Sequence, residues 1–297
     1  MNTNKNKWAI IELFLVNAYW GYTTVLMKNV LQYMSSNAYI LLRFTSAALF
    51  LCIIYYKKIR TINYKTWIRG LLLGVTIALP MLLSVYGLNF TSASNSVFIG
   101  QLSFIIVPMF VMIYHRTKPS IYFIITTVLL LLGLIIFSDA INSGFNSGDF
   151  ITFIGMFINC ITILLTSHFM KNEDALELGI AQIIGAAVVS ILFGLHDLPK
   201  VEWCNESILI IILTGIIGSG VAFTMRTHSQ KYLSPILISV MSVVTPIFGL
   251  IGASQIPNLQ NQVEIITSPK IFGSVMLIIA LLYYTTNELK PKKRKMP

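Results

Sequence analysis

Charge is scarce in this chain of 297 residues, and acidic residues are the scarcest of the charged types. Asp, Glu, Lys and Arg together make up 11% of the sequence, whereas soluble domains carry about 25%. Hydrophobic residues make up 56%. A water-soluble surface cannot be built from this composition, which excludes an ordinary soluble enzyme or binding domain.

Cysteine and histidine are also few, and their spacing is unsuited to metal binding. The three cysteines form no CxxC pair and are odd in number, which argues against a disulfide framework or a structural metal. The four histidines form no HxxxH pair, so we expect neither a metal site nor an imidazole relay, and no cofactor. The cysteines are Cys52, Cys160 and Cys204, and the histidines are His115, His168, His196 and His228.

Apolar stretches of about 20 residues, the length that crosses a hydrocarbon core about 30 Å thick, recur along the whole chain. They predict an all-α integral membrane protein with ten transmembrane helices and no soluble domain. The predicted spans cover residues 8–27, 38–56, 70–89, 95–114, 121–138, 150–170, 178–195, 207–225, 235–255 and 271–287.

The basic residues behind the net charge of +10 are distributed according to the predicted topology, so we do not expect nucleic acid as a partner. Most Lys and Arg residues lie in the even-numbered loops and the two termini, among them Arg226 and the basic tail 292–295. This bias toward one side predicts that both termini are cytoplasmic. The tail would hold the last helix against anionic headgroups.

The second five spans echo the first five, which predicts two repeats, residues 1–145 and 146–297. Without a gap, Trp20 aligns with Asn159 and Arg43 with Gln182, and each fourth span of a half carries a late proline, Pro108 or Pro246. An odd number of spans per repeat inverts one half relative to the other, as in many secondary transporters.

Several segments resemble the drug/metabolite transporter superfamily, specifically its ten-helix EamA-type permeases. They are Trp20-Gly21 followed by Lys28, Leu42-Arg43-Phe44, residues 91–99 leading to Val107-Pro108, residues 230–235, and residues 244–248. The resemblance implies two five-helix repeats around a central cavity and transport of small organic solutes, often outward across the bacterial inner membrane. Many relatives carry a Gly-Glu pair after the ninth span, where this chain has residues 252–255, Gly-Ala-Ser-Gln.

Polar residues within the spans are the candidates for the substrate cavity, because unpaired polar groups are expensive in lipid. For each of them, a hydrogen bond between helices is the alternative interpretation. Arg43 would bind a carboxylate or phosphate in a cavity, or would extend to the outer headgroups instead. The candidates are Trp20, Arg43, Tyr86, Asn95, Gln101, Asn159, Gln182, Ser239 and Ser242.

Two further sets of residues have mechanistic interpretations. Glu12 is the acid well inside a span, and it is either a partly solvated interfacial group or a proton-coupling carboxyl. Pro80, Pro108 and Pro246 interrupt helical hydrogen bonding and are candidates for helix breaks or gating, with packing kinks as the alternative.

These observations favour a permease that moves a small organic solute by alternating access, with export of amino acids or related metabolites as the leading class. A multidrug or quaternary-amine exporter of the same fold is the alternative. An integral-membrane lipid-modifying enzyme is disfavoured, because the spans offer Glu12 but no acid, base and nucleophile together. The expected partners are the lipid bilayer and a small-molecule substrate, with the protein a monomer or homodimer.

The topology can be tested at the end of the chain. A fluorescent reporter that matures only in the cytoplasm, fused after Pro297, should be bright because ten spans return the chain to the starting side. Whole-cell fluorescence measures this, normalised to the amount of fusion protein on a blot. A well-expressed but dark fusion would contradict the ten-span count.

Overall fold

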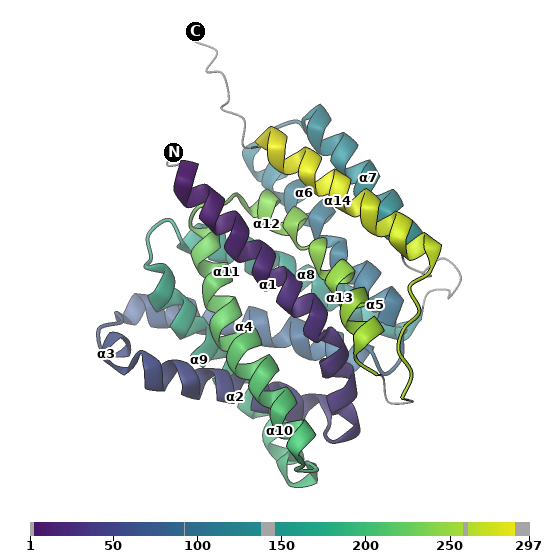
Figure 1. Cartoon of the computed structure of the whole chain (residues 1–297). Coiled ribbons are helices and arrows are strands. Elements are labelled where there is room, and N and C mark those ends of the chain that lie inside the picture. The colour runs from purple at the N-terminus through teal and green to yellow at the C-terminus, as the bar shows by residue number, and fades with distance from the viewer. Residues whose placement is uncertain (1–2, 92, 138–145, 258–260, 289–297) are drawn as a thin grey trace.

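The computed structural model describes residues 3–91, 93–137, 146–257 and 261–288. Within these ranges the chain forms helices joined by short loops, with no β-strand (Figure 1). The predicted all-α class is confirmed.

In the first half the helices are α1 (Thr3–Asn29), η1 (Val30–Gln32), α2 (Ser36–Ile54), α3 (Tyr56–Ile59), α4 (Tyr64–Gly87), α5 (Ala93–Gln101), α6 (Ser103–His115) and α7 (Ile121–Phe137). In the second half they are α8 (Ser147–Phe169), α9 (Ala175–Gly194), η3 (Leu195–Lys200), α10 (Asn205–Ile211), η4 (Ile212–Val221), α11 (Ala222–Gln230), α12 (Pro235–Met241), α13 (Val244–Gln255) and α14 (Ser268–Glu288).

Each predicted span corresponds to a helical segment of the described chain. Nine segments are long and apolar enough to cross a membrane, and α7 is a shorter apolar helix. The predicted end of the fifth span, Ser138, lies outside the described residues. The first residues of α1 and the last of α14 lie at the same end of the molecule (Figure 1), as an even number of spans requires.

Large apolar side chains cover the outside of the helices. Ile53, Ile113 and Leu192 are 72%, 70% and 79% exposed. Such surfaces are unfavourable in water but match the hydrocarbon of a bilayer. The lipid bilayer is therefore the surrounding medium of this fold.

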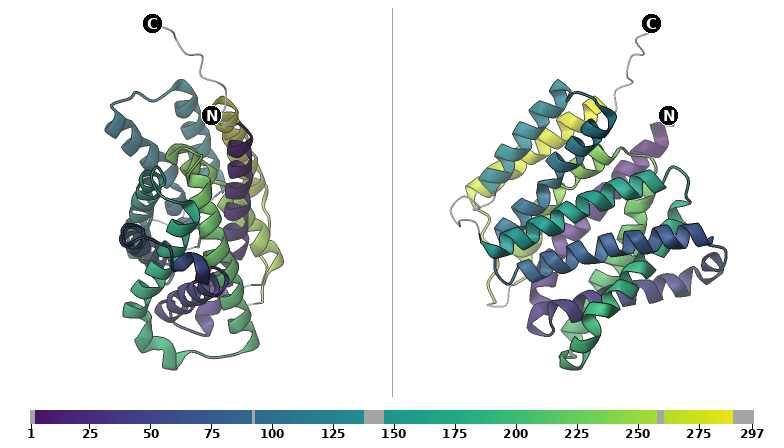
Figure 2. Two further views of the ribbon diagram at one scale, coloured as in Figure 1. Left: turned by 90° about the vertical axis from the view of Figure 1, so that its left-hand side faces the viewer. Right: turned by 180° about the vertical axis from the view of Figure 1, so that it is seen from behind.

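The helices of the two halves pack reciprocally. Helix α1 contacts α11 and α13, and its counterpart α8 contacts α4 together with α5 and α6. In the same way α2 packs on η4, and α9 packs on α4. Helices α7 and α14 pair with each other at the edge of the bundle (Figures 1 and 2). Exchanging the halves thus reproduces these main contacts. The proposed repeat boundary after residue 145 adjoins undescribed residues and stays a prediction.

Helix starts follow the ungapped alignment of the halves. The Ser35 hydroxyl accepts a hydrogen bond from the Ala38 amide at the start of α2. The Asp174 carboxylate accepts from the Leu176 and Glu177 amides at the start of α9. Both caps satisfy amides that a helix leaves without an internal partner. Ser35 and Asp174 are paired in the register that pairs Trp20 with Asn159.

Two glycines let helices of opposite halves come into backbone contact. A Cβ on Gly74 of α4 would lie 2.3 Å from the Gly185 carbonyl carbon of α9. A Cβ on Gly215 of η4 would lie 2.1 Å from Ser46 Oγ and 2.9 Å from the Arg43 carbonyl oxygen of α2. Small residues are what allow such close packing in membranes, and here they occupy equivalent crossings of the two halves.

The fourth span of each half is broken near its middle. Helix α5 ends at Gln101 and α6 begins at Ser103, while α12 ends at Met241 and α13 begins at Val244. At both breaks the amides bond three residues back, from Leu102 to Ile99 and from Val243 to Val240. This is the tighter 3₁₀ pattern that often marks a hinge.

Pro246 and Pro80 have different local consequences. Pro246 cannot donate to the Ser242 carbonyl, and the Thr245 amide donates to that carbonyl at 2.9 Å instead. Helix α4 continues through Pro80 without a break. The carbonyl that Pro80 leaves without its usual donor belongs to Thr76, and the Thr162 hydroxyl of α8 donates to it. A neighbouring helix thus satisfies the freed group, as lipid burial demands.

The contact between Thr162 and the proline turn yields a stability prediction. Thr162→Val should lower the free energy of unfolding by about 1 kcal/mol, because the Thr76 carbonyl loses its donor. In a Pro80→Ala background the loss should be smaller, since residue 80 then has its own amide to donate. Denaturant unfolding of the purified protein in detergent measures both values.

Thr286→Val is the matched control, because the Thr286 hydroxyl is exposed and bonds only within its own helix. Its effect should be close to zero. An equal loss for Thr162→Val in both backgrounds would contradict the assigned role of Thr162.

Candidate functional site

The interface between α1 and the eighth span, made of α10, η4 and α11, carries polar contacts along most of its length. The π-helical segment η4 is at its centre. The Trp20 indole N–H donates to the Gly218 carbonyl at 2.7 Å. The Tyr19 hydroxyl donates to the Leu213 carbonyl at 2.9 Å. π-helical turns occur often at functional sites, and this one presents two backbone acceptors to α1.

Arg43 of α2 lies behind this contact and is 2% exposed. Its Nε donates to Ser219 Oγ at 2.7 Å and its Nη1 to the Tyr39 hydroxyl at 3.1 Å. Nη1 also lies 3.3 Å from Met27 Sδ. The side chain is therefore directed into the protein, and the alternative in which it extends toward the headgroups does not describe it.

Arg226 is placed differently from the sequence-based expectation. We assigned it to a cytoplasmic loop, but it belongs to α11, and its guanidinium carbon lies 5.4 Å from the centroid of the Trp20 ring. A helical Cβ points toward the N-terminal end of its helix, which carries this side chain from the helix end toward the membrane interior. The hydrophobicity pattern ended the span too early, at Met225.

Trp20 is thus held on several sides. Besides the Gly218 bond and Arg226, its ring packs on Phe223 with centroids 4.7 Å apart. Asn159, the aligned partner of Trp20, is half-buried in α8.

Glu12 forms a pair that the sequence spacing did not reveal. Its carboxylate lies 2.7 Å from His228 Nδ1 and accepts a hydrogen bond from the Ser229 hydroxyl at 3.2 Å. Glu12 is half-buried and His228 is exposed. The imidazole is a second group able to bind a proton beside the carboxylate, so His228 extends the candidate proton-coupling site beyond Glu12.

The two broken helices meet through a side-chain bond. The Ser242 hydroxyl can donate to the Ser239 carbonyl at 2.6 Å or to Gln101 Oε1 at 3.2 Å, and the second contact links the break of the fourth span to that of the ninth. Gln101 is 8% exposed. Asn17 of α1 donates to the Met241 carbonyl at the same break. These contacts join three helices of both halves at the hinge region.

The remaining candidates do not join one cluster. Gln182 is buried and donates to Thr227 at 2.5 Å, which is a bond between helices. Ser239 is buried and donates to the Ile236 carbonyl of its own helix. Tyr86 is 47% exposed and packs on Phe90, away from the α1 interface. Asn95 lies in α5, but its side chain lies outside the part that the structure describes.

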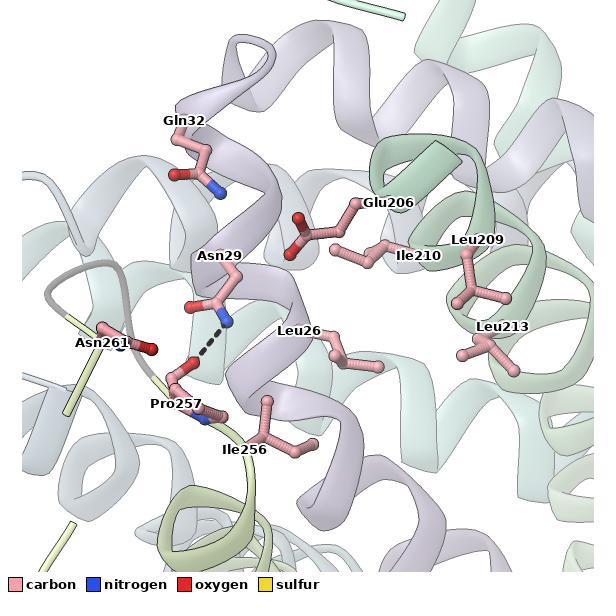
Figure 3. Close-up of a pocket in the computed structure, with 10 residues that line it drawn as sticks. All are labelled: Leu26, Asn29, Gln32, Glu206, Leu209, Ile210, Leu213, Ile256, Pro257 and Asn261. Atoms are coloured by element: carbon pink, nitrogen blue, oxygen red, sulfur yellow. Dashed lines mark hydrogen bonds between the residues drawn. The ribbon is translucent and has the colours of Figure 1, made fainter. Parts of the chain in front are cut away.

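A crevice of about 470 Å³ opens beside the C-terminal part of α1, at the end opposite to Glu12. Its wall includes Leu26, Asn29, Glu206 and Leu213, whose side chains surround the hollow in Figure 3. The Leu213 carbonyl is the acceptor for Tyr19, so the inner end of the crevice adjoins the central contacts. The crevice does not extend to Trp20, which is not part of its wall.

Glu206 has one clear partner in this crevice. It accepts from the Tyr33 hydroxyl at 2.6 Å, and this bond raises the pKa of Tyr33 to about 12. The phenol therefore stays protonated as a donor at neutral pH. Among the described residues, no group of three or more His, Cys, Asp or Glu side chains is arranged to hold a metal ion.

Comparison with known proteins agrees with this architecture. Residues 7–139 match the EamA-like transporter family. These residues are a little under half of the chain. A protein of Archaeoglobus fulgidus named "uncharacterized transporter" is 23% identical over 283 residues, which are 94% of this chain and 86% of that protein. The predicted resemblance to EamA-type permeases is confirmed, and both matches support a membrane transporter.

A solved crystal structure has the same fold. It superposes with a TM-score of 0.75 at 13% sequence identity and covers 96% of this chain and 99% of that one. At this identity the likeness concerns the fold alone. It shows that the shared helix arrangement extends through both halves of this chain.

The link between the hinges gives a transport prediction. Gln101→Leu and Ser242→Ala should each reduce solute flux by about fivefold, the effect of losing a bond worth about 1 kcal/mol. The double variant should lose no more than the stronger single variant, because both remove one contact. Flux into proteoliposomes, normalised to reconstituted protein, measures this.

Ser254→Ala is the matched control on α13, since its hydroxyl bonds only to the Ile251 carbonyl. It should transport like the unmodified protein. Normal solute flux in both Gln101→Leu and Ser242→Ala would show that the contact between Gln101 and Ser242 contributes to packing and not to transport.

Proposed function

We propose that this EamA-type permease moves a small organic solute across the membrane by alternating access, with export of amino acids or related metabolites as its leading role. The observation that carries the proposal is the reciprocal packing of the two halves. Because the main contacts of α1, α2 and η4 have counterparts at α8, α9 and α4, an arrangement open to one side has an equivalent open to the other. A solute bound between the halves would then be exposed to each side in turn.

The hinge geometry supports this mechanism. Both fourth spans of the halves break into 3₁₀ turns, and Gln101 and Ser242 connect the two breaks. Such turns bend at low cost, whereas the packed α4 and α9 crossing is rigid. Motion concentrated at the breaks would open one side while the crossings hold the halves together.

Glu12 is the proposed site of proton coupling, with His228 as its partner. An imposed pH gradient should then change the flux in the unmodified protein and leave it unchanged in Glu12→Gln, whose amide cannot titrate. Equal flux with and without a gradient in the unmodified protein would favour uniport or exchange.

A solute panel tests the function as a whole. Purified protein in liposomes should accelerate the saturable flux of at least one labelled amino acid above that of empty liposomes. Quaternary amines and drugs are tested in parallel, because selective flux of these compounds would favour the multidrug alternative. Absence of flux for every solute would contradict the transporter mechanism.

A further inference from the structure

We propose that Arg226 binds the anionic group of the transported solute, a carboxylate or phosphate ester, and that Arg43 positions the site without touching the solute. This proposal rests on the transport function proposed above. It assigns a binding role to a residue that the sequence pattern places at the end of a span.

The two arginines differ in how their donors are used. Arg43 donates to Ser219 and Tyr39 and contacts the Met27 sulfur. Arg226 has no hydrogen bond or ion pair within the described part of the chain. Arg226 is partly exposed, and its nitrogens are absent from the fully buried polar atoms that lack a partner, so they retain some accessible surface. A guanidinium has five N–H donors, and those of Arg226 are therefore available to a ligand.

The ring of Trp20 fixes where that ligand would lie. The Arg226 guanidinium stacks over the Trp20 face at 5.4 Å, a favourable cation–π distance. Trp20 is itself fixed by its bond to the Gly218 carbonyl, and Arg43 holds the adjacent Ser219. This chain of contacts makes Arg43 a positioning residue for the ring on which Arg226 rests.

The charge balance favours an anion over a cation. Arg43 and Arg226 both lack a carboxylate within 4 Å among the described residues. The nearby acid on α1, Glu12, is bonded to His228 and Ser229 instead. A charged group inside a membrane is expensive and is usually retained for function. An oxyanion with two oxygens would satisfy Arg226 by parallel hydrogen bonds, whereas an ammonium group would be repelled.

Equilibrium binding in detergent tests the site without requiring transport. Of the four tryptophans, Trp8, Trp67 and Trp203 are replaced by phenylalanine, so that Trp20 is the sole reporter of fluorescence. The matched probes are phenylacetate, phenyl phosphate and phenethylamine, which share an aromatic ring and differ in charge. We expect saturable quenching by at least one of the anions and none by the amine.

Variants of Arg226 then identify the binding group. Arg226→Gln should weaken anion binding about 10- to 100-fold, the loss of a charge-assisted bond of 1.5–3 kcal/mol. Arg226→Lys keeps the charge but not the paired donors, and should bind with intermediate affinity. Lys231→Gln removes a charge from the exposed end of the same helix and should leave binding unchanged.

Three results would overturn the proposal. They are saturation by the amine but by neither anion, no saturation by any probe, and equal anion affinity in Arg226→Gln and the unmodified protein. Thermal melting of each variant excludes misfolding, with Arg226→Lys as the second variant if Arg226→Gln does not fold. Phosphatidylglycerol in mixed micelles is titrated separately, and saturation by this lipid alone would assign the site to headgroups and overturn the solute role. Anion binding without flux would contradict the transport function while leaving the site in place.

Discussion

The burial of the Arg43 guanidinium is the constraint on which the centre of the protein depends. A charged group in the interior must have its donors satisfied or it destabilises the fold by several kcal/mol. Ser219 and Tyr39 supply acceptors, and Ser219 reaches Arg43 because the adjacent crossing has Gly215, which lacks a side chain, against α2. The π-helical turn that presents Ser219 also presents the Gly218 carbonyl to Trp20. One buried cation therefore fixes the relative positions of α1, α2 and the eighth span.

The arrangement of spans was readable from the sequence because bilayer thickness acts directly on hydropathy. Stretches of about 20 apolar residues have few alternatives in lipid, and the register that aligns Trp20 with Asn159 also aligns the caps Ser35 and Asp174. The contacts of the central region were not readable in the same way. Arg226 lies at the end of a span, where the mean hydropathy decreases. Mean hydropathy does not show whether a side chain at such a position points into the protein interior or toward the solvent.

Pairs distant in the chain were the other limit. Glu12 and His228 are 216 positions apart, so no local spacing indicates their contact. Without an HxxxH pair, the sequence gives His228 no predicted role. The glycine-rich run around Gly218 allows close helix packing at Gly215. The hydrogen bond from Trp20 to the Gly218 carbonyl depends on the π-helical turn and is visible only in three dimensions.

The glycine crossings also have a mechanical consequence. At Gly74 and Gly215 the backbone of one half touches a helix of the other, α9 in one case and α2 in the other. At Gly74 backbone meets backbone, and at Gly215 the backbone meets the Ser46 hydroxyl and the Arg43 carbonyl, so both crossings keep the helices at close to the smallest separation that they can have. Under the proposed alternating access, the two crossings would hold the halves at this separation while the breaks of the fourth spans bend. A gap that widens on one face of the membrane would then be accompanied by a gap that narrows on the other.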